Sequence, residues 1–193
     1  MKKLVIATCN LGKVREFQEI LGAKWEVLST RDLGDVPEVI EDGETFQENA
    51  CKKALAIAQL TKAPVIADDS GLEVEALNGA PGVYSARYAG ESATDSDNNL
   101  KLLKALQGAT DRRAQFRCVL AVAESKQITA TYEGVCKGKI METLSGEGGF
   151  GYDPLFVPEG ESLSFAELLP KLKNAMSHRG KAIEHLTREH IWQ

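Results

Sequence analysis

The sequence predicts an α/β protein with a mixed twisted sheet, flanking helices and two lobes around a central cleft. Strand, helix and strand follow one another at the start of the chain, and two segments with period-2 alternation occupy its middle. Helical segments continue to the C-terminus. Because apolar strand and helix faces must be buried against each other, we expect one two-lobed domain over residues 1–193.

The elements of the N-terminal half follow from apolar spacing and capping residues. Residues 3–8 predict a buried strand, and Asn10 can cap the helix that follows. Val14, Phe17 and Leu21 recur in that helix at helical spacing, and Gly22 ends it. The next predicted elements are a strand at 25–28, an acidic loop at 31–43, a helix at 45–60 and a buried strand at 64–68.

In the C-terminal half the alternating segments predict a hairpin. One face of the first segment carries Ala114, Phe116, Cys118, Leu120 and Val122, and one face of the second carries Ala130, Tyr132, Cys136 and Ile140. The connection 124–127 is short enough for an antiparallel hairpin, although it lacks a glycine. Flanking predictions are a turn at 78–82, a helix at 96–106, a short strand at 155–157 and helices beyond it.

Composition excludes several classes of protein. The net charge of −5 arises from 28 acidic and 23 basic residues without a Lys/Arg run, so we expect no nucleic-acid partner. No apolar stretch is long enough for a signal peptide or a membrane span, which predicts a cytosolic protein without a membrane partner. The four cysteines lack CxxC spacing, which argues against zinc and against disulfides.

The first polar cluster joins a strand to a helix N-terminus. It consists of Thr8, Cys9, Asn10, Leu11, Gly12 and Lys13. Free amides and the helix dipole favour an anion there, and Lys13 adds a full charge. The segment matches neither the P-loop nor the dinucleotide fingerprint. The alternative is an ordinary capped helix with a surface lysine.

Two further clusters carry carboxylates. Asp68 and Asp69 directly follow a buried strand, where they point in different directions and can bind a hard cation or activate water. The alternative is a capping turn. In the acidic loop, Glu41 can join such a metal site, while Asn49 and Lys53 share a helix face and Lys53 can reach a phosphate. Acidic runs are more often simply solvated.

The C-terminal third holds a glycine-rich loop and a basic cluster. Residues 148–154, GGFGYDP, leave the backbone bare and predict close approach of a flat ligand to its amides, with an ordinary turn as the alternative. In residues 173–179, Ser177 can cap the last helix. His178 and Arg179 would then lie in its first turn, where positive charge suits the helix dipole poorly and a functional reason would explain it.

Together these segments resemble the inosine triphosphate pyrophosphatase family, the dITP/XTP pyrophosphatases. The matching segments are ATCNLGK at 7–13, TFQENACKKA at 45–54, ADDSG at 67–71, GAPGVYSARYAG at 79–90, GGFGYDP at 148–154 and SHR at 177–179. They occur in the family's order across nearly the whole chain. One departure is Cys9, where the family usually has glycine.

The resemblance implies a magnesium-dependent, homodimeric hydrolase of non-standard purine nucleoside triphosphates. ITP, dITP and XTP would be cut between the α and β phosphates, which keeps deaminated purines out of nucleic acids. Asp69 is the implied general base and metal ligand, Asp68 and Glu41 are further metal candidates, and Glu38 is an alternative in the loosely aligned acidic loop.

The resemblance also assigns the substrate contacts. Residues 8–13 and Lys53 would hold the phosphates, and Ser70 would add a ligand contact. Phe150 would stack on the base, with Gly151, Tyr152 and Asp153 completing that wall. The residues that would read the purine, including its 6-keto oxygen, are Lys173, His178 and Arg179. Two alternatives remain: a pyrophosphatase for pyrimidine or methylated nucleotides, and a nucleotide-binding module without turnover.

Overall fold

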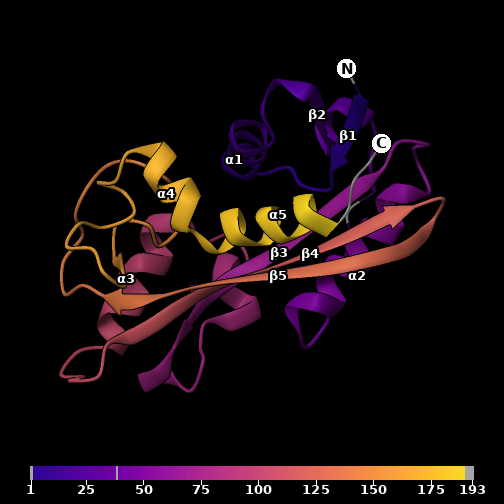
Figure 1. The fold of residues 1–193 in the computed structure, drawn as a ribbon. Coiled ribbons are helices and arrows are strands. Elements are labelled where there is room, and N and C mark those ends of the chain that lie inside the picture. Colours follow the sequence, from indigo (N-terminus) through magenta and orange to yellow (C-terminus); the bar gives the residue numbers. More distant parts are fainter. Residues whose placement is uncertain (1, 38, 190–193) are drawn as a thin grey trace. The chain divides into compact units, whose positions relative to one another are not determined.

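The computed structural model of the chain describes residues 2–37 and 39–189. Its helices and strands are interspersed along the chain (Figure 1). In order they are β1 Lys2–Ile6, α1 Leu11–Leu21, β2 Trp25–Ser29, α2 Phe46–Ala58, β3 Val65–Val74, α3 Asp95–Ala105, β4 Arg113–Glu124, β5 Gln127–Ile140, β6 Phe156–Pro158, α4 Pro170–Met176 and α5 His178–Glu189.

The strands form one six-stranded mixed sheet in the order β2-β1-β3-β4-β5-β6. β1 pairs in parallel with β2 on one side and with β3 on the other. β5 pairs with β6 in antiparallel register, with Lys139 opposite Val157. The predicted mixed sheet with flanking helices is therefore confirmed.

The chain divides into two compact units. The first unit comprises the chain up to Asp69, residues 118–134 and the chain from Arg179 onward; the second comprises residues 70–117 and 135–178. The long strands β3, β4 and β5 therefore each contribute residues to both units.

Each unit has its own apolar core. In the first, α1 and α5 pack onto strands β1, β3, β4 and β5 through a buried cluster of Leu4, Ile6, Phe17, Ile66, Cys118, Leu120, Val122, Tyr132, Ala182, Ile183 and Leu186. In the second, α3 and the segment around β6 contribute to a cluster of Leu72, Val74, Leu102, Leu106, Ala114, Phe116, Cys136, Ile140, Tyr152, Leu155, Phe156, Phe165 and Leu168. The residues predicted for one face of the hairpin are buried in these cores or packed against them, as expected, but residues 118–123 of β4 are buried on both faces and do not alternate in burial.

Helix starts follow the capping residues of the sequence. The Asn10 side chain accepts hydrogen bonds from the amides of Gly12 and Lys13, as predicted. Capping boxes begin the other two long helices of the N-terminal two-thirds, with Thr45 and Glu48 at α2 and with Thr94 and Asp97 at α3.

Two local predictions need correction or completion. The sequence predicts that β3 ends at residue 68, but the strand continues to Val74, because Leu72 and Val74 are buried and extend the apolar face beyond Gly71. Asp68, Asp69 and Ser70 therefore lie within the strand and not at its end. The hairpin turn has positive φ at both Ser125 and Lys126. This is the backbone geometry of a two-residue type I′ turn, which is formed here without a glycine.

Candidate functional site

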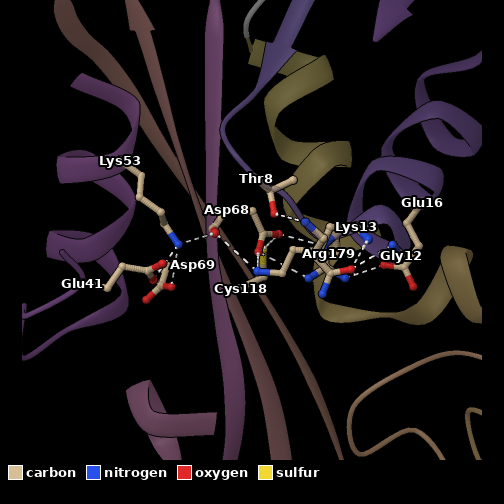
Figure 2. Close-up of polar contacts among 11 residues, drawn as sticks. Thr8, Gly12, Lys13, Glu16, Glu41, Lys53, Asp68, Asp69, Cys118 and Arg179 are labelled. Carbon is tan, nitrogen blue, oxygen red and sulfur yellow. Dashed lines mark hydrogen bonds and ion pairs between the residues drawn. The ribbon is translucent and has the colours of Figure 1, made fainter. Parts of the chain in front are cut away.

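Asp68 and Asp69 occupy successive positions of β3 and therefore point to opposite sides of the strand. Figure 2 shows the consequence: Lys13 and Arg179 approach Asp68, whereas Lys53 and Glu41 lie with Asp69. Both carboxylates are buried. The first unit therefore holds two separate charged clusters that share one strand.

Asp68 is surrounded by donors. Its Oδ1 accepts from Lys13 Nζ at 2.5 Å, and its Oδ2 accepts from Arg179 Nε at 2.7 Å and lies 3.1 Å from Cys118 Sγ. Burial alone would raise the pKa of Asp68, but Arg179 and Lys13 hold it well below its usual value. These two cations therefore favour the ionised form of Asp68, which ties β3 to α1 and to the start of α5.

Arg179 connects this cluster to α1 through a second ion pair, with Glu16. Its side chain is fully buried, with 1% of the residue exposed. Burial opposes its positive charge, but Asp68 and Glu16 raise the pKa of Arg179 well above its usual value. This guanidinium is therefore held in the first unit by carboxylates on two different elements.

The predicted anion loop leads into α1. Thr8 Oγ1 accepts from the amide of Asn10 at 3.1 Å, and Asn10 in turn caps the helix. Cys9 is exposed, and its Sγ lies 3.1 Å from Thr30 Oγ1. Leu11 and Gly12 form the exposed or half-buried first turn, and Lys13 points back to Asp68. The loop therefore combines a helix N-terminus with one lysine directed toward the interior.

The second charged cluster consists of Glu41, Lys53 and Asp69. Lys53 Nζ donates to Glu41 Oε2 at 2.8 Å, to Asp69 Oδ1 at 3.0 Å and to the Asp68 carbonyl at 3.0 Å. Burial opposes the lysine charge, but Asp69 and Glu41 outweigh it and raise the pKa of Lys53. Burial likewise opposes ionisation of Glu41, yet Lys53 lowers its pKa.

Asp69 behaves differently from its neighbours. Burial raises the pKa of Asp69 to about 6, with a smaller contribution from Glu41 and against the attraction of Lys53 and Lys13. Its Oδ2 is buried and has no hydrogen-bond partner among the described residues. Below about pH 6 a proton shared with Glu41 would supply one, which agrees with the raised pKa. This oxygen is the one buried carboxylate atom in the described chain without a donor.

One face of α2 holds the acidic loop beside Asp69. Asn49 Oδ1 accepts from the amide of Gly43 at 2.8 Å, and Lys53, one turn further along, bonds Glu41. A side chain at Gly43 would meet Asn49 Oδ1 at 2.6 Å, so this position requires glycine. The shared helix face predicted for Asn49 and Lys53 is confirmed. Glu38 lies outside the described residues.

In the second unit, residues 148–154 form the glycine loop, which is built around Asp153. Asp153 Oδ2 accepts from the amide of Phe150 at 2.9 Å and from Lys173 Nζ at 2.7 Å. The Lys173 ammonium lies 5.1 Å from the centroid of the Phe150 ring, within the range of a cation–π contact. The predicted residues Phe150, Asp153 and Lys173 are thus brought together.

Close contacts within the protein explain why two loop positions are glycine. A side chain at Gly148 would meet the Ala166 carbonyl at 2.7 Å, and one at Gly149 would overlap the Asp153 carboxylate. The amides of Phe150 and Gly151 donate to the carboxylates of Asp153 and Asp95. The expectation that a ligand approaches the loop amides is therefore wrong for these two, because carboxylates already occupy them. Open space remains only beside Gly151 among these glycines.

The other predicted residues of the second unit are also buried or half-buried. The Tyr152 hydroxyl donates to the Ser85 carbonyl at 2.8 Å, which anchors the loop to the segment after the 78–82 turn. The His178 ring is buried and stacks on Phe116 with 4.7 Å between ring centroids. Ser70 is half-buried in β3. Ser177 lies between α4 and α5 with extended backbone, where a cap of α5 would stand.

Several residues of these clusters are not predicted by the sequence. Glu16 pairs with Arg179, and Cys118 contacts Asp68. Asp95 and Asn99 both contact Gly151. For Glu16 and Cys118 the sequence indicates a role only through position. Glu16 is about one turn after Lys13, and Cys118 is at an inward-facing strand position. The i, i+4 spacing of Asp95 and Asn99 is the one signal that they act together.

Residues 2–37 and 39–189 contain neither a preformed metal cluster nor a membrane helix. No group of three or more His, Cys, Asp or Glu side chains in these ranges is placed to hold a metal ion. None of the described helices has both the length and the apolar character that a membrane crossing requires.

Known proteins resemble this chain over nearly its full length. Residues 4–189 match the Ham1 family. The dITP/XTP pyrophosphatase of Desulfotalea psychrophila is 54% identical over 187 residues, which cover 96% of this chain and 84% of that protein. The dITP/XTP pyrophosphatase of Desulforamulus reducens is 55% identical over 186 residues, covering 94% of this chain and 92% of that protein.

Solved structures agree. The HAM1 protein of Coxiella burnetii has a TM-score of 0.86 and 44% identity, with 97% of this chain and 98% of that chain covered. The Ham1 protein of Staphylococcus aureus has a TM-score of 0.85 at 44% identity, with 97% of each chain covered. The resemblance predicted from the six sequence segments is thus confirmed, and the chain belongs to the Ham1 family.

Proposed function

We propose that this protein hydrolyses the non-standard purine nucleoside triphosphates ITP, dITP and XTP to the monophosphate and pyrophosphate. The names of its relatives, dITP/XTP pyrophosphatases, support this reaction and these substrates. The observation that carries the proposal is the buried carboxyl group of Asp69, with a pKa raised to about 6, between Lys53 and Glu41.

Asp69 has the properties of a general base. With a pKa near 6 it is mostly ionised at neutral pH, yet it is basic enough to take a proton from water. In the proposed reaction the water oxygen bonds to the α-phosphorus while its proton passes to Asp69. The bond between that phosphorus and the oxygen bridging to the β-phosphate then breaks, and pyrophosphate leaves.

The positive groups of the first unit suit the charge of a triphosphate. Lys13 and Lys53 supply two cations, and residues 8–13 lead into the N-terminus of α1. Charge develops on the departing pyrophosphate during the reaction, and cations held in fixed positions stabilise it. We therefore assign these groups to the phosphates.

Magnesium is part of the proposal. The carboxylate oxygens of Glu41 and Asp69, including the buried Oδ2 without a donor, are the hard ligands that this ion prefers. When bound, it would neutralise phosphate charge and polarise the reacting phosphoryl group. Asp68 fits this role less well, because both of its oxygens already contact Lys13, Arg179 or Cys118.

The glycine loop is the proposed base site. Phe150 offers an aromatic ring for stacking, and Lys173 and His178 offer donors in the same unit. Hypoxanthine and xanthine present a 6-keto acceptor, whereas adenine presents an amino donor. A buried donor left unpaired by adenine would cost about 1–3 kcal/mol. The predicted contact of Arg179 with the base remains a prediction.

Other parts of the assignment rest on the resemblance alone. A homodimer, a cytosolic location and a single two-lobed domain all remain proposals. They suit an enzyme that clears a nucleotide pool.

A substrate panel tests the function. ITP, dITP, XTP, ATP, GTP, dUTP and dTTP are incubated with the protein, with and without magnesium, and pyrophosphate release is measured. We expect turnover of the first three with magnesium, and near loss of turnover with a retained fold in Asp69→Asn. Preference for dUTP or dTTP would favour a pyrophosphatase for pyrimidine nucleotides. Tight ITP binding without pyrophosphate release would favour a nucleotide-binding module. Near-wild-type rates in Asp69→Asn would remove Asp69 from catalysis.

A further inference from the structure

We propose that Asp95 and Asn99 are positioning residues, which hold the Gly151 backbone and thereby orient the Phe150 ring for binding of the base. The inference rests on the base-binding role proposed for the glycine loop. Neither residue belongs to the motifs that the family resemblance covers.

Two side chains of α3 hold both peptide groups that flank Gly151. Asp95 Oδ2 accepts from the Gly151 amide at 2.7 Å, and Asn99 Nδ2 donates to the Gly151 carbonyl at 2.9 Å. Because the two residues are four positions apart, they project from the same helix face. The Phe150–Gly151 and Gly151–Tyr152 peptide planes are thus both fixed from one rigid helix.

The stability of α3 explains these residues only in part: Asp95 lies in the first turn, where a carboxylate suits the helix dipole, but that role does not require its bond to Gly151. Its N-terminus is already capped, because Thr94 and Asp97 form a capping box. The neighbouring Asn98 contacts a different segment, since it accepts from the Ala89 amide at 2.8 Å and donates to the Ala86 carbonyl at 3.1 Å. Asp95 and Asn99, by contrast, direct their hydrogen bonds to the glycine loop.

The buried position of Asn99 is energetically unfavourable for a polar side chain. Only 3% of the residue is exposed, and its Oδ1 is buried without a hydrogen-bond partner among the described residues. A buried amide oxygen without a donor destabilises a protein by about 1–3 kcal/mol, so an apolar residue would pack here at lower cost. The side chain nevertheless donates from Nδ2 to Gly151, which indicates that the loop needs this bond.

Without these bonds the loop would lose its fixed geometry at the proposed stacking residue. Gly151 has a φ of +60°, and no atom lies within 4 Å of the place where a Cβ would stand, so no contact on that side of the residue fixes its backbone. Phe150 is held on its other side by the bond from its amide to Asp153 at 2.9 Å. With Asp95 and Asp153 both in place, the Phe150 backbone is set before a base arrives, which lowers the entropy cost of binding.

The proposal predicts an effect on base affinity and not on the chemical step. Asp95→Ala and Asn99→Leu each remove one net hydrogen bond, and about 1.4 kcal/mol corresponds to a tenfold weaker Kd. We expect a KM for ITP, and a Kd for IMP by calorimetry, about tenfold higher in each, with kcat within about twofold of wild type. Asp95→Asn keeps an acceptor for the Gly151 amide and should restore affinity.

Asp97→Ala is the matched control, because it weakens the cap of the same helix without touching the loop. If it raises the IMP Kd as much as Asn99→Leu, the effect is one of helix stability and the proposal is wrong. Unchanged IMP affinity in Asp95→Ala and Asn99→Leu would also overturn it. Thermal denaturation identifies variants that fail to fold, for which Asn99→Ser replaces Asn99→Leu.

The IMP measurement separates this inference from the proposed function. If the wild-type protein binds IMP but hydrolyses no triphosphate, the proposed reaction is wrong and the variants still decide the role of α3. If the wild-type protein does not bind IMP, the glycine loop is not a base site and the inference is overturned.

Discussion

The carboxyl groups of Asp68 and Asp69 are consecutive in β3, yet their pKa values are displaced in opposite directions. Both are buried, which penalises the charged form of each. Arg179 and Lys13 overcome this penalty at Asp68 and lower its pKa, whereas Lys53 only partly offsets it at Asp69, whose pKa rises to about 6. One strand thus carries a carboxylate with a lowered pKa and a proton acceptor with a raised pKa at neighbouring positions.

The raised pKa of Asp69 predicts how stability depends on pH. A carboxyl group whose pKa is higher in the folded than in the unfolded protein stabilises the fold at low pH, and this contribution is lost as pH rises through the folded value. The shift from 3.8 to about 6 is roughly two units, or about 3 kcal/mol. In buffer with a metal chelator, the stability of wild type relative to Asp69→Asn should fall by about that much between roughly pH 4 and pH 7.

Urea denaturation across this pH range measures the effect. Asp42→Asn serves as the control: a hydrogen bond from Lys52 and its charge lower the pKa of Asp42, so the stability of wild type relative to this variant should not fall as pH rises. Parallel stability curves for wild type and Asp69→Asn would show that Asp69 titrates normally.

Lys53 is expected to compete with a divalent cation. Its ammonium pairs with Glu41 and Asp69, the two carboxylates proposed to hold magnesium. Lys53→Met should therefore bind Mg²⁺ about tenfold more tightly in the absence of nucleotide, while its KM for ITP rises because a phosphate contact is lost. Titration calorimetry with MgCl₂ measures the first effect.

The adjacent lysine offers a close control for this experiment. Lys52 pairs with the exposed Asp42 and should leave the affinity for Mg²⁺ unchanged when replaced by methionine. Equal or weaker binding of Mg²⁺ by Lys53→Met would mean that the lysine and the cation do not share these oxygens.

Arg179 is predicted to contribute strongly to stability. Arg179→Ala would take the arginine away from both Glu16 and Asp68, which are buried carboxylates. Removing one partner of a buried pair costs about 3–5 kcal/mol, and Arg179→Lys should cost less because it keeps a charge. Chemical denaturation measures both, and a loss below about 1 kcal/mol for Arg179→Ala would contradict the network.

The same position tests the predicted role in base selection. If Arg179 also reads the 6-keto oxygen, the ratio of kcat/KM for ITP to that for ATP should fall in Arg179→Lys, which we expect to lose less stability than Arg179→Ala. A constant ratio would assign Arg179 to the charged cluster alone.

Phe150 is predicted to act only on the base. Stacking on an aromatic ring is worth about 1–3 kcal/mol per base, so Phe150→Leu should raise the KM for ITP by about fivefold or more. Inhibition by inorganic triphosphate, which has no base, should stay at the wild-type level. Tyr84→Leu replaces an exposed aromatic residue of the same unit and should change neither quantity. Equal effects of Phe150→Leu on both ligands would exclude stacking.

Local patterns in the sequence predict most of the fold. Asn10 and Thr45 stand where α1 and α2 begin, and alternation over residues 114–122 places the inward face of β4. The true end of β3 is not predicted, because Asp68 and Asp69 break the apolar pattern. Their partners are Lys13, Lys53 and Arg179, which lie far away in the sequence. No local pattern reveals that these cations balance the charges of the two aspartates.

The site is less predictable for the same reason. The sequence identifies Phe150, Asp153 and Lys173 through a resemblance, but the use of the loop amides depends partly on a carboxylate far away in the chain. Asp95 lies 56 residues before Gly151, and Asn99 lies 52 before it. Such contacts depend on tertiary packing, which periodicity and capping rules do not describe.

Cys118 gives the Asp68 cluster an internal reporter. Its thiol is fully buried 3.1 Å from Asp68 Oδ2, and burial together with Asp68 raises its pKa well above the usual value. An alkylating reagent reacts with an accessible thiolate, so it can modify Cys118 only while this part of β4 is transiently open. The rate of that labelling, followed by mass spectrometry in a Cys9→Ser background, would report how often this part of β4 opens. A nucleotide that binds near Lys13 and stabilises its contact with Asp68 should slow the labelling.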